Sequence, residues 1–163
     1  MTPQVKLLFD ECVGSHIAEK LAQFLLDTGQ NVEVKHIREF QQLGTPDEIW
    51  VPKLSALGYV TITGDRSKDP KKTKLKLLCV KFQMTLLMLA TSVYQLKSAD
   101  KAIALTAAWH KIMQVAAGPR GDRYMMSMST GSTPTIWPMP ITDEERRKAA
   151  SYTLPNLRFE LEP

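Results

Sequence analysis

Short apolar runs alternate with helical patterns along most of this chain of 163 residues. Residues 5–9 and 85–90 are almost entirely apolar, which is typical of strands buried on both faces of a parallel sheet. Residues 31–37 alternate apolar and polar side chains, which predicts a strand nearer an edge, and 59–63 and 124–129 complete the candidate strands. Because strands that alternate with helices pair in parallel through right-handed crossovers, the sequence predicts a three-layer α/β fold with a mostly parallel central sheet.

Helix signals lie between the first three candidate strands. Ser15 is the predicted cap of the first helix, and Gly29 stands where a left-handed terminator is expected. In the stretch TPDEIW, Thr45 is the predicted N-cap and Glu48 its reciprocal partner in a capping box. Pro52 lies well inside this second helix, so we expect it to kink the helix or to divide it in two.

The second half of the chain continues the alternation and then changes character. Further helices are predicted over 72–83 and from a cap at Ser98 to the Gly-Pro pair that follows the apolar pattern. The last segment begins rich in proline and later carries capping-box spacing from Thr142. It holds too many apolar side chains for a free tail, so we expect it to pack on its own domain or on a partner. The predicted units are a domain at 1–132 and a Pro-rich C-terminal extension at 133–163.

Charge and cysteine content limit the functional classes. The chain has 21 Lys and Arg against 17 Asp and Glu, a mild basic excess that permits a polyanionic partner without requiring one. Cys12 and Cys79 are too few for a disulfide framework, and no Cys/His spacing predicts zinc. The sequence shows neither a signal peptide nor an apolar run of about eighteen residues, so we expect a cytoplasmic protein without membrane association.

Acidic residues follow two of the predicted strands and open one predicted helix. Asp10 and Glu11 come directly after the first strand, and Asp65 stands just past the third. Because ligands of open parallel sheets bind outside the carboxyl ends of the strands, we expect these acids at one edge of the sheet. Asp47 and Glu48 would join them from the helix start. A divalent cation relieves the repulsion in such a cluster, and hard oxygen ligands favour Mg²⁺ or Mn²⁺.

Three segments combine these acids with strand ends in a fixed order. They are LLFDE at 7–11, TPDEIW at 45–50 and YVTITGDR at 59–66. Together they resemble the compact PIN-like domains related to VapC-type toxins of toxin-antitoxin systems. In those domains an acid ends the first strand, an aspartate opens a helix, and a later strand ends in a T-x-D signature. The resemblance implies a PIN-like fold in which Asp10, Asp47 and Asp65 bind metal.

The resemblance also implies metal-dependent cleavage of RNA, in which bound ions activate a water and stabilise charge on the phosphorus and the leaving oxygen. A cognate antitoxin would then be a partner, and a homodimer is possible. The glutamate that fuller PIN domains take from a middle helix has no clear counterpart, so Glu11 or Glu48 would replace it. We favour Glu11 as the fourth catalytic acid because Glu48 has a predicted local role with Thr45.

Basic residues begin one position after Asp65 and are candidates for holding the phosphates that flank the cleaved bond. The candidate substrate-binding residues are Arg66, Lys68, Lys71 and Lys72, and Lys74 and Lys76 continue the run. Runs of this kind are also typical of a solvated helix face, so the lysines only support the assignment.

Two other classes of function stay open. Receiver-like domains accept a phosphoryl group on an aspartate, and Thr91 or Ser92 resembles the hydroxyl that they use. They also need a lysine at the end of their last strand, which the stretch MSMSTGS does not offer. The second alternative is a PIN-like fold that has lost catalysis and only binds a partner. A titration with Mn²⁺ separates this alternative from a nuclease.

Overall fold

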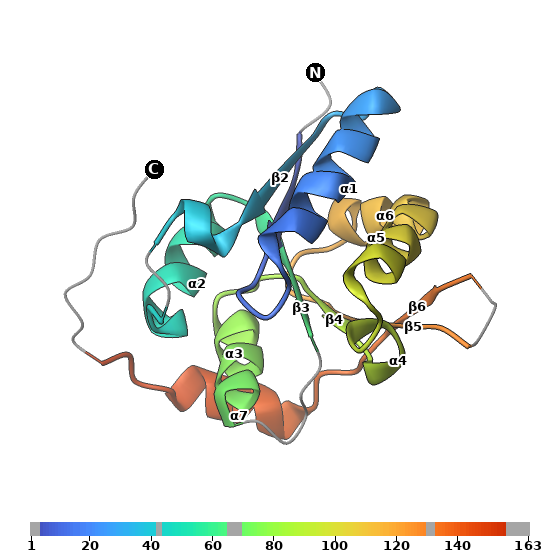
Figure 1. Cartoon of the computed structure of the whole chain (residues 1–163). Helices are drawn as coiled ribbons and strands as arrows, with labels where there is room; N and C mark the ends of the chain where they lie inside the picture. The colour runs from blue at the N-terminus through green and yellow to red at the C-terminus, as the bar shows by residue number, and fades with distance from the viewer. Residues whose placement is uncertain (1–3, 42–43, 65–69, 130–132, 156–163) are drawn as a thin grey trace.

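The computed structural model describes residues 4–41, 44–64, 70–129 and 133–155, with the side chains of 70–72 excepted. Within these ranges six strands form one sheet in the order β2-β1-β3-β4-β5-β6 (Figure 1). They are β1 (Val5–Phe9), β2 (Val32–His36), β3 (Tyr59–Gly64), β4 (Leu86–Leu89), β5 (Arg123–Ser127) and β6 (Thr135–Pro138). β1 to β5 pair in parallel and β6 runs antiparallel to β5, so the predicted α/β fold with a mostly parallel sheet is confirmed.

Helices cover both faces of this sheet (Figure 1). α1, α5 and α6 pack on one face, and α2, α3 and α7 lie on the other. The described helices are α1 (Ser15–Asp27), η1 (Ile37–Glu39), α2 (Asp47–Ala56), α3 (Pro70–Lys81), α4 (Thr91–Tyr94), α5 (Ser98–Ala107), α6 (Trp109–Ala117) and α7 (Asp143–Ser151).

Side chains along the central strands alternate between two core layers. Leu7 and Phe9 of β1 pack towards α1, α5 and α6, whereas Leu8 packs towards α2 and α3. In β4 the same alternation sends Leu87 to the first layer and Met88 to the second. Burial on both faces explains why these strands read as nearly continuous apolar runs. β2 lies at one edge of the sheet and is only partly buried, as its alternating sequence predicts.

Three predicted helix caps, Ser15, Thr45 and Ser98, are wrong. The N-caps are Gly14, Pro46 and Lys97, and none of them closes its helix with a side-chain hydrogen bond. Ser15 and Ser98 already lie inside their helices, and Thr45 precedes the cap by one residue. An N-cap needs an extended backbone one residue before the first helical turn, and the side-chain pattern alone does not locate that residue.

Two predictions about helix length also differ from the structure. α2 is one helix through Pro52, so the predicted division is wrong, whereas a kink stays a prediction; Pro52 has no N–H to donate to the Glu48 carbonyl. The single helix expected from Ser98 is instead two helices, α5 and α6, which meet at the buried Ala108. The predicted terminator of the first helix is confirmed, because Gly29 adopts a φ of 75°.

The C-terminal segment continues the same sheet. β6 extends it beyond β5, and α7 packs against α3. The predicted capping box at Thr142 is confirmed by its reciprocal bonds with Glu145. Glu145 also forms an ion pair of 2.6 Å with Arg123 at the start of β5, which joins α7 to the sheet. The described part of this segment therefore packs on its own domain, whereas a domain boundary at residue 132 stays a prediction.

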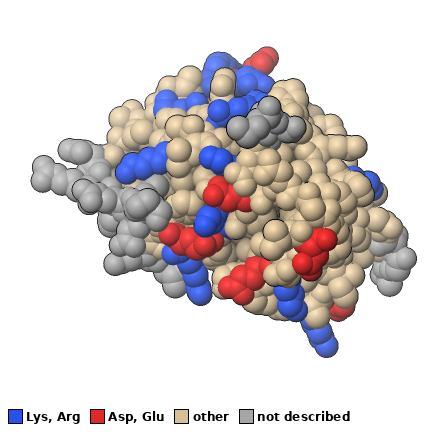
Figure 2. Space-filling view, turned by 90° about the horizontal axis from the view of Figure 1, so that it is seen from above, with Lys and Arg blue, Asp and Glu red and all other residues tan. Residues whose placement is uncertain are grey.

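The surface towards the viewer in Figure 2 carries charges of both signs. Lys and Arg side chains lie between Asp and Glu side chains and many uncharged residues. On the described part of this face, mixed charge provides no extended cationic track for a nucleic acid. Among the described helices, none is long and apolar enough to cross a membrane.

Candidate functional site

The connections of the sheet change direction between β1 and β3. From β1 the chain passes to β2 on one side, and then crosses to β3 and β4 on the other. Open parallel sheets bind ligands at such a switch point, outside the carboxyl ends of the strands. Asp10 directly follows β1, and Gly64 is the last residue of the neighbouring β3. The candidate site therefore lies at this end of the β1–β3 pair.

Asp10 is held firmly at this edge and is only 7% exposed. The hydroxyl of Thr63 donates to its Oδ2 atom at 2.8 Å, and the amide of Glu11 donates to its Oδ1 atom at 2.6 Å. Its own backbone amide donates to the carbonyl of Ile62 at 3.1 Å, which continues the pairing of β1 with β3. Both carboxylate oxygens are thus oriented by groups of the two strand ends.

Cys12 adds a third connection between the strand ends. Its Sγ atom lies 3.3 Å from the Thr63 hydroxyl and 3.8 Å from Asp10 Oδ2, and it accepts the Gly64 amide at 3.1 Å. The thiol packs against the apolar core. Its contacts show that it also belongs to the polar group around Asp10.

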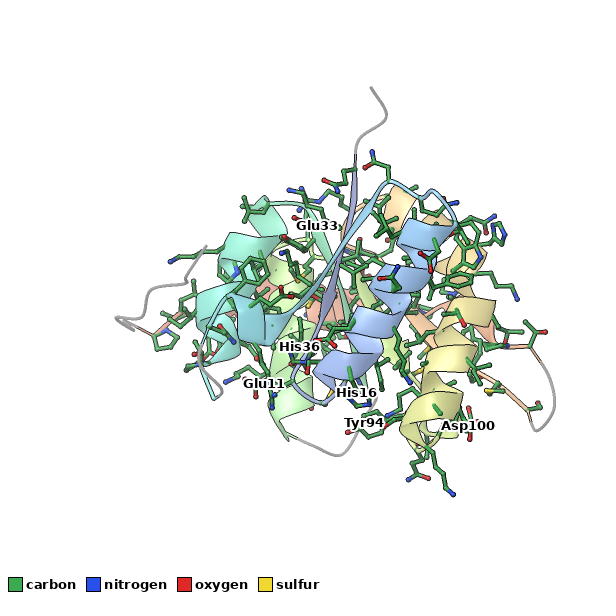
Figure 3. The ribbon with its side chains drawn as sticks, turned by 45° about the horizontal axis from the view of Figure 1, so that its top comes forward. Glu11, His16, Glu33, His36, Tyr94 and Asp100 are labelled. Carbon is green, nitrogen blue, oxygen red and sulfur yellow. The ribbon has the colours of Figure 1, made fainter. Side chains whose placement is uncertain are left out.

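His36, at the end of β2, holds the turn that carries Asp10. The imidazole is buried, and its Nε2 atom donates to the Val13 carbonyl at 2.6 Å while Nδ1 accepts the Arg38 amide at 3.2 Å. This pair of bonds assigns the neutral tautomer with its proton on Nε2. Figure 3 shows His36 and Glu11 towards the same end of the sheet, whereas Glu33 lies nearer the other end of β2.

Glu48 occupies a different environment from Asp10. Its carboxylate forms an ion pair of 2.8 Å with Lys74 of α3 and accepts the Tyr152 hydroxyl at 3.3 Å. Burial would raise the pKa of Glu48, but the hydrogen bond and charge of Lys74, together with Tyr152, lower it below its ordinary value. The predicted capping box with Thr45 does not form. Glu48 joins α2, α3 and the C-terminal segment.

Glu11 and Asp47 each accept one described hydrogen bond. The Glu11 side chain is exposed and accepts the Gly44 amide at 3.0 Å. Asp47, in the first turn of α2, accepts the indole N–H of Trp50 at 3.1 Å. No group of three His, Cys, Asp or Glu side chains within the described ranges is arranged to hold a metal ion.

Several predicted site residues cannot be placed. Asp65, Arg66 and Lys68 lie outside the described residues, and so do the side chains of Lys71 and Lys72. Asp65 follows Gly64 directly in the sequence. The metal-site and substrate-site roles of these residues therefore stay predictions.

The described donors around Asp10 fit part of a magnesium or manganese site. A carboxylate is a suitable hard ligand, and ligating carboxylates are usually oriented by further hydrogen bonds, as Thr63 and the Glu11 amide orient this one. Asp10 alone does not complete a coordination sphere. Asp10 therefore fits as one oriented metal ligand, at the strand end where the sequence predicts it.

Tyr94 and Lys101 lie beside this group and are missed by the sequence analysis. A Cβ atom at Gly64 would lie 2.4 Å from the Tyr94 ring, so the ring covers the end of β3 closely. The ammonium of Lys101 lies 4.8 Å from the centre of that ring, and the residue is only 9% exposed. The sequence does contain a signal for Lys101. This residue lies four residues before Leu105, so a helix places it on the same inward face as that apolar residue.

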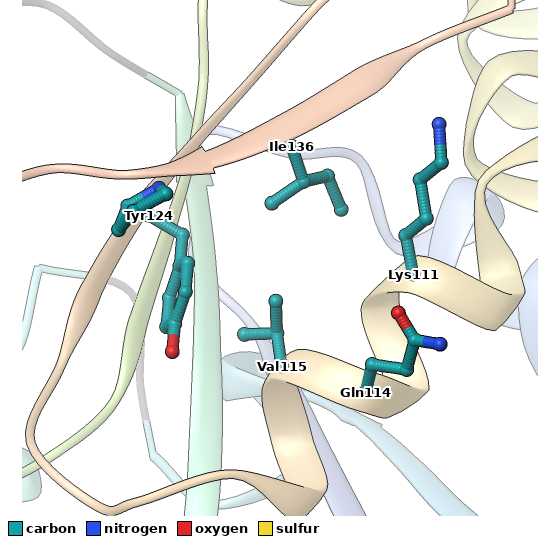
Figure 4. Close-up of a pocket in the computed structure, with 6 residues that line it drawn as sticks. Lys111, Gln114, Val115, Tyr124 and Ile136 are labelled. Carbon is teal, nitrogen blue, oxygen red and sulfur yellow. The ribbon is translucent and has the colours of Figure 1, made fainter.

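A pocket of about 390 Å³ lies elsewhere, between α6 and the β5–β6 hairpin (Figure 4). Its described lining consists of Lys111, Gln114, Val115, Tyr124, Ile136 and Pro138. None of these side chains is acidic, and the Lys111 ammonium donates to the Pro134 carbonyl at 3.0 Å. The pocket is therefore separate from the acids at the carboxyl ends of β1 and β3.

Comparison with known proteins identifies the first half of this fold. Residues 5–79 match a family model described as a PIN like domain, and this span runs from β1 into α3. Neither the curated proteins nor the solved structures gave a match. PIN-like domains are typically metal-dependent nucleases. The matched span includes Asp10, Asp47 and Thr63, and this match supports the PIN-like interpretation of residues 5–79.

Proposed function

We propose that this protein is a metal-dependent ribonuclease whose site is built around Asp10. The observation that carries the proposal is the placement of this buried carboxylate at the switch point of the sheet, with both oxygens oriented by Thr63 and the Glu11 amide. The PIN-like match over residues 5–79 supports a nuclease in general. RNA as the substrate is our inference from the resemblance to toxin-type PIN-like domains.

The residues of this chain would prepare the site for a cation. Asp10 would hold Mg²⁺ or Mn²⁺, with Asp65 and Asp47 as the further proposed ligands. A bound cation would supply an activated water and would stabilise charge on the phosphorus and the leaving oxygen. Thr63 fixes one Asp10 oxygen and so limits the rotation of the carboxylate. His36 fixes the turn behind it through the Val13 carbonyl.

The test makes the same chemical change, Asp to Asn, near the start of α1 and at its end. Asp10→Asn keeps the side-chain shape and removes the ligand charge, so we expect metal-dependent cleavage of RNA to be abolished. Asp27→Asn is the control, because Asp27 is exposed at the far end of α1 and bonds only locally to Gln23 among the described contacts. Cleavage is measured with Mg²⁺, with Mn²⁺ and with chelator. Wild-type cleavage by pure Asp10→Asn protein would remove the assignment.

A PIN-like domain that binds a partner without catalysis is the second candidate. It is favoured by the ion pair that Glu48 makes with Lys74, because a carboxylate already paired with an ammonium is less available to a metal ion. Calorimetric titration with Mn²⁺ distinguishes the two candidates, since the binding protein would take up no ion. The sheet order also occurs in receiver-like domains, but residues 124–132 hold no lysine for a phosphoryl group.

We propose a toxin role, with a cognate antitoxin as partner, on the basis of the sequence resemblance alone. A cytoplasmic location and a homodimer are proposals of the same standing. The direct observation would be a small upstream open reading frame that encodes a DNA-binding antitoxin. Co-expression of the two proteins should then suppress the cleavage activity and yield a stable complex on gel filtration.

A further inference from the structure

Lys101 of α5 is a buried cation without a carboxylate partner in the described part of the chain. The residue is 9% exposed, and the contacts described for its ammonium are with the Tyr94 ring, at 4.8 Å, and electrostatically with Cys12. Lysine is rarely buried unless it is paired, because an ammonium loses hydration that an aromatic face replaces only in part. Burial lowers the pKa of Lys101, and Cys12 opposes this shift. The fold therefore bears an energetic penalty at this position.

Short contacts connect this lysine with the acid at the carboxyl end of β1. The Tyr94 ring that lies under the ammonium packs against Gly64, which ends β3. The Gly64 amide donates to the Cys12 thiol, and that thiol lies 3.8 Å from the Asp10 carboxylate. In Figure 3, Tyr94 lies beside the start of α1, at the same end of the sheet as Glu11. Lys101 thus lies at the border of the site and not on a remote surface.

A site that carries acids and takes up a phosphodiester needs positive charge from its walls as well as from an ion. An ammonium has three donors on a flexible stem and binds phosphate as a point charge. We propose that Lys101 binds a phosphate group of the RNA substrate next to Asp10. This proposal rests on the ribonuclease function proposed above. In the free protein the Tyr94 ring holds the ammonium in place, and the substrate phosphate supplies the missing negative partner.

The experiment measures RNA affinity as a function of salt for wild type, Lys101→Gln and Lys101→Arg. Fluorescence anisotropy with a labelled single-stranded RNA, in Ca²⁺ or chelator to prevent cleavage, gives the affinity. Lys101→Gln should weaken RNA binding about tenfold. It should also reduce the slope of log K against log salt by about 1, the value expected for one lost phosphate contact. Lys101→Arg should keep the wild-type slope. Lys53→Gln is the matched control, because Lys53 is exposed in the last turn of α2.

Two further measurements separate the possible failures. Thermal unfolding of Lys101→Gln should show a melting temperature no lower than wild type, because a buried unpaired charge is removed. Its Mn²⁺ affinity should stay within about twofold of wild type, since Lys101 is not a ligand. Unchanged RNA affinity and salt slope in Lys101→Gln would overturn this proposal alone. Wild-type protein that binds no RNA would overturn this proposal together with the ribonuclease function.

Discussion

Asp10 is buried and Glu48 is half-buried. The same sequence argument assigns both carboxylates to one metal site, yet their surroundings differ. Asp10 follows β1 and accepts a hydroxyl, from Thr63, and a backbone amide. Glu48 lies in the first turn of α2 and is paired with the Lys74 ammonium at 2.8 Å. The contacts described for Asp10 thus come from neutral donors that orient its oxygens, whereas Glu48 is paired with an ammonium.

The different contacts of Asp10 and Glu48 indicate that one carboxylate serves the site and the other stabilises the packing of helices. The Glu48 ion pair joins α2 to α3, and the Tyr152 hydroxyl joins Glu48 to the C-terminal segment. These elements lie on the face of the sheet that α2, α3 and α7 cover. The contacts of Asp10 with Thr63 and Cys12 join only the ends of the two central strands. We therefore expect changes near Asp10 to affect activity first, and changes at Glu48 to affect stability first.

After the loss of Asp10 itself, the largest effect should come from Thr63→Val, which removes the hydroxyl that fixes Asp10 while keeping the β-branched shape. We expect catalytic activity or metal affinity to fall about 10- to 100-fold, as is typical when a group that orients a metal ligand is lost. Single-turnover cleavage and Mn²⁺ titration measure the two quantities. Thr61→Val is a control on the same strand, because the buried Thr61 hydroxyl contacts Met84 instead. Equal activity in both variants would show that the Thr63 hydroxyl does not position Asp10 for metal binding.

An intermediate effect is expected at Glu48. Glu48→Gln should lower the free energy of unfolding by about 1 to 2 kcal/mol at neutral pH, because Lys74 loses its charged partner. The activity per folded molecule should not change. Urea unfolding followed by circular dichroism measures the stability, and Glu144→Gln, at an exposed ion pair in α7, is the control.

The pH dependence gives the sign of the Glu48 contribution. Because the pKa of Glu48 is lowered in the folded protein from an ordinary value of 4.5, its stabilisation is fully present above that value and is lost as the pH falls through the folded pKa. The stability difference between wild type and Glu48→Gln should therefore shrink in this acid range. A difference that stays constant down to low pH would show that the ion pair is not its source.

The smallest effect is expected for Glu11→Gln. The amide oxygen of glutamine can still accept the Gly44 N–H, so the stability should stay within about 0.5 kcal/mol of wild type. If Glu11 is the fourth ligand, the Mn²⁺ affinity should nevertheless fall several-fold. Unchanged metal affinity in Glu11→Gln would remove Glu11 from the proposed ligand set.

The sequence predicts β1 to β5, because burial on both faces leaves nearly continuous apolar runs in strands such as β1 and β4. It misses β6, the edge strand Thr135–Pro138, whose side chains are mostly exposed and which ends in a proline. It predicts helix starts poorly, since Ser15 and Ser98 have suitable side chains but stand one residue beyond the extended cap. The division at Ala108 is also missed, because the apolar stripe continues through the break and only packing on the sheet reveals it.

For the candidate site, the sequence locates Asp10 because a strand end is a local feature. The partners of Glu48 come from distant segments, and Tyr152 lies 104 residues further along the chain, so no local pattern reveals them. Lys101 could have been noticed as a charge on an apolar helix face. Its position beside Tyr94 and the end of β3 depends on tertiary packing.

Calorimetric titration of Mn²⁺ into Asp10→Asn and Glu48→Gln shows which of the two carboxylates holds the metal ion. Both changes replace one carboxylate by its isosteric amide, so each removes one negative charge and keeps the shape of the side chain. If Asp10 is the anchored ligand and Glu48 a structural ion-pair partner, Asp10→Asn will lose Mn²⁺ binding and Glu48→Gln will bind Mn²⁺ as wild type does. The account is contradicted if Asp10→Asn binds Mn²⁺ normally while Glu48→Gln does not.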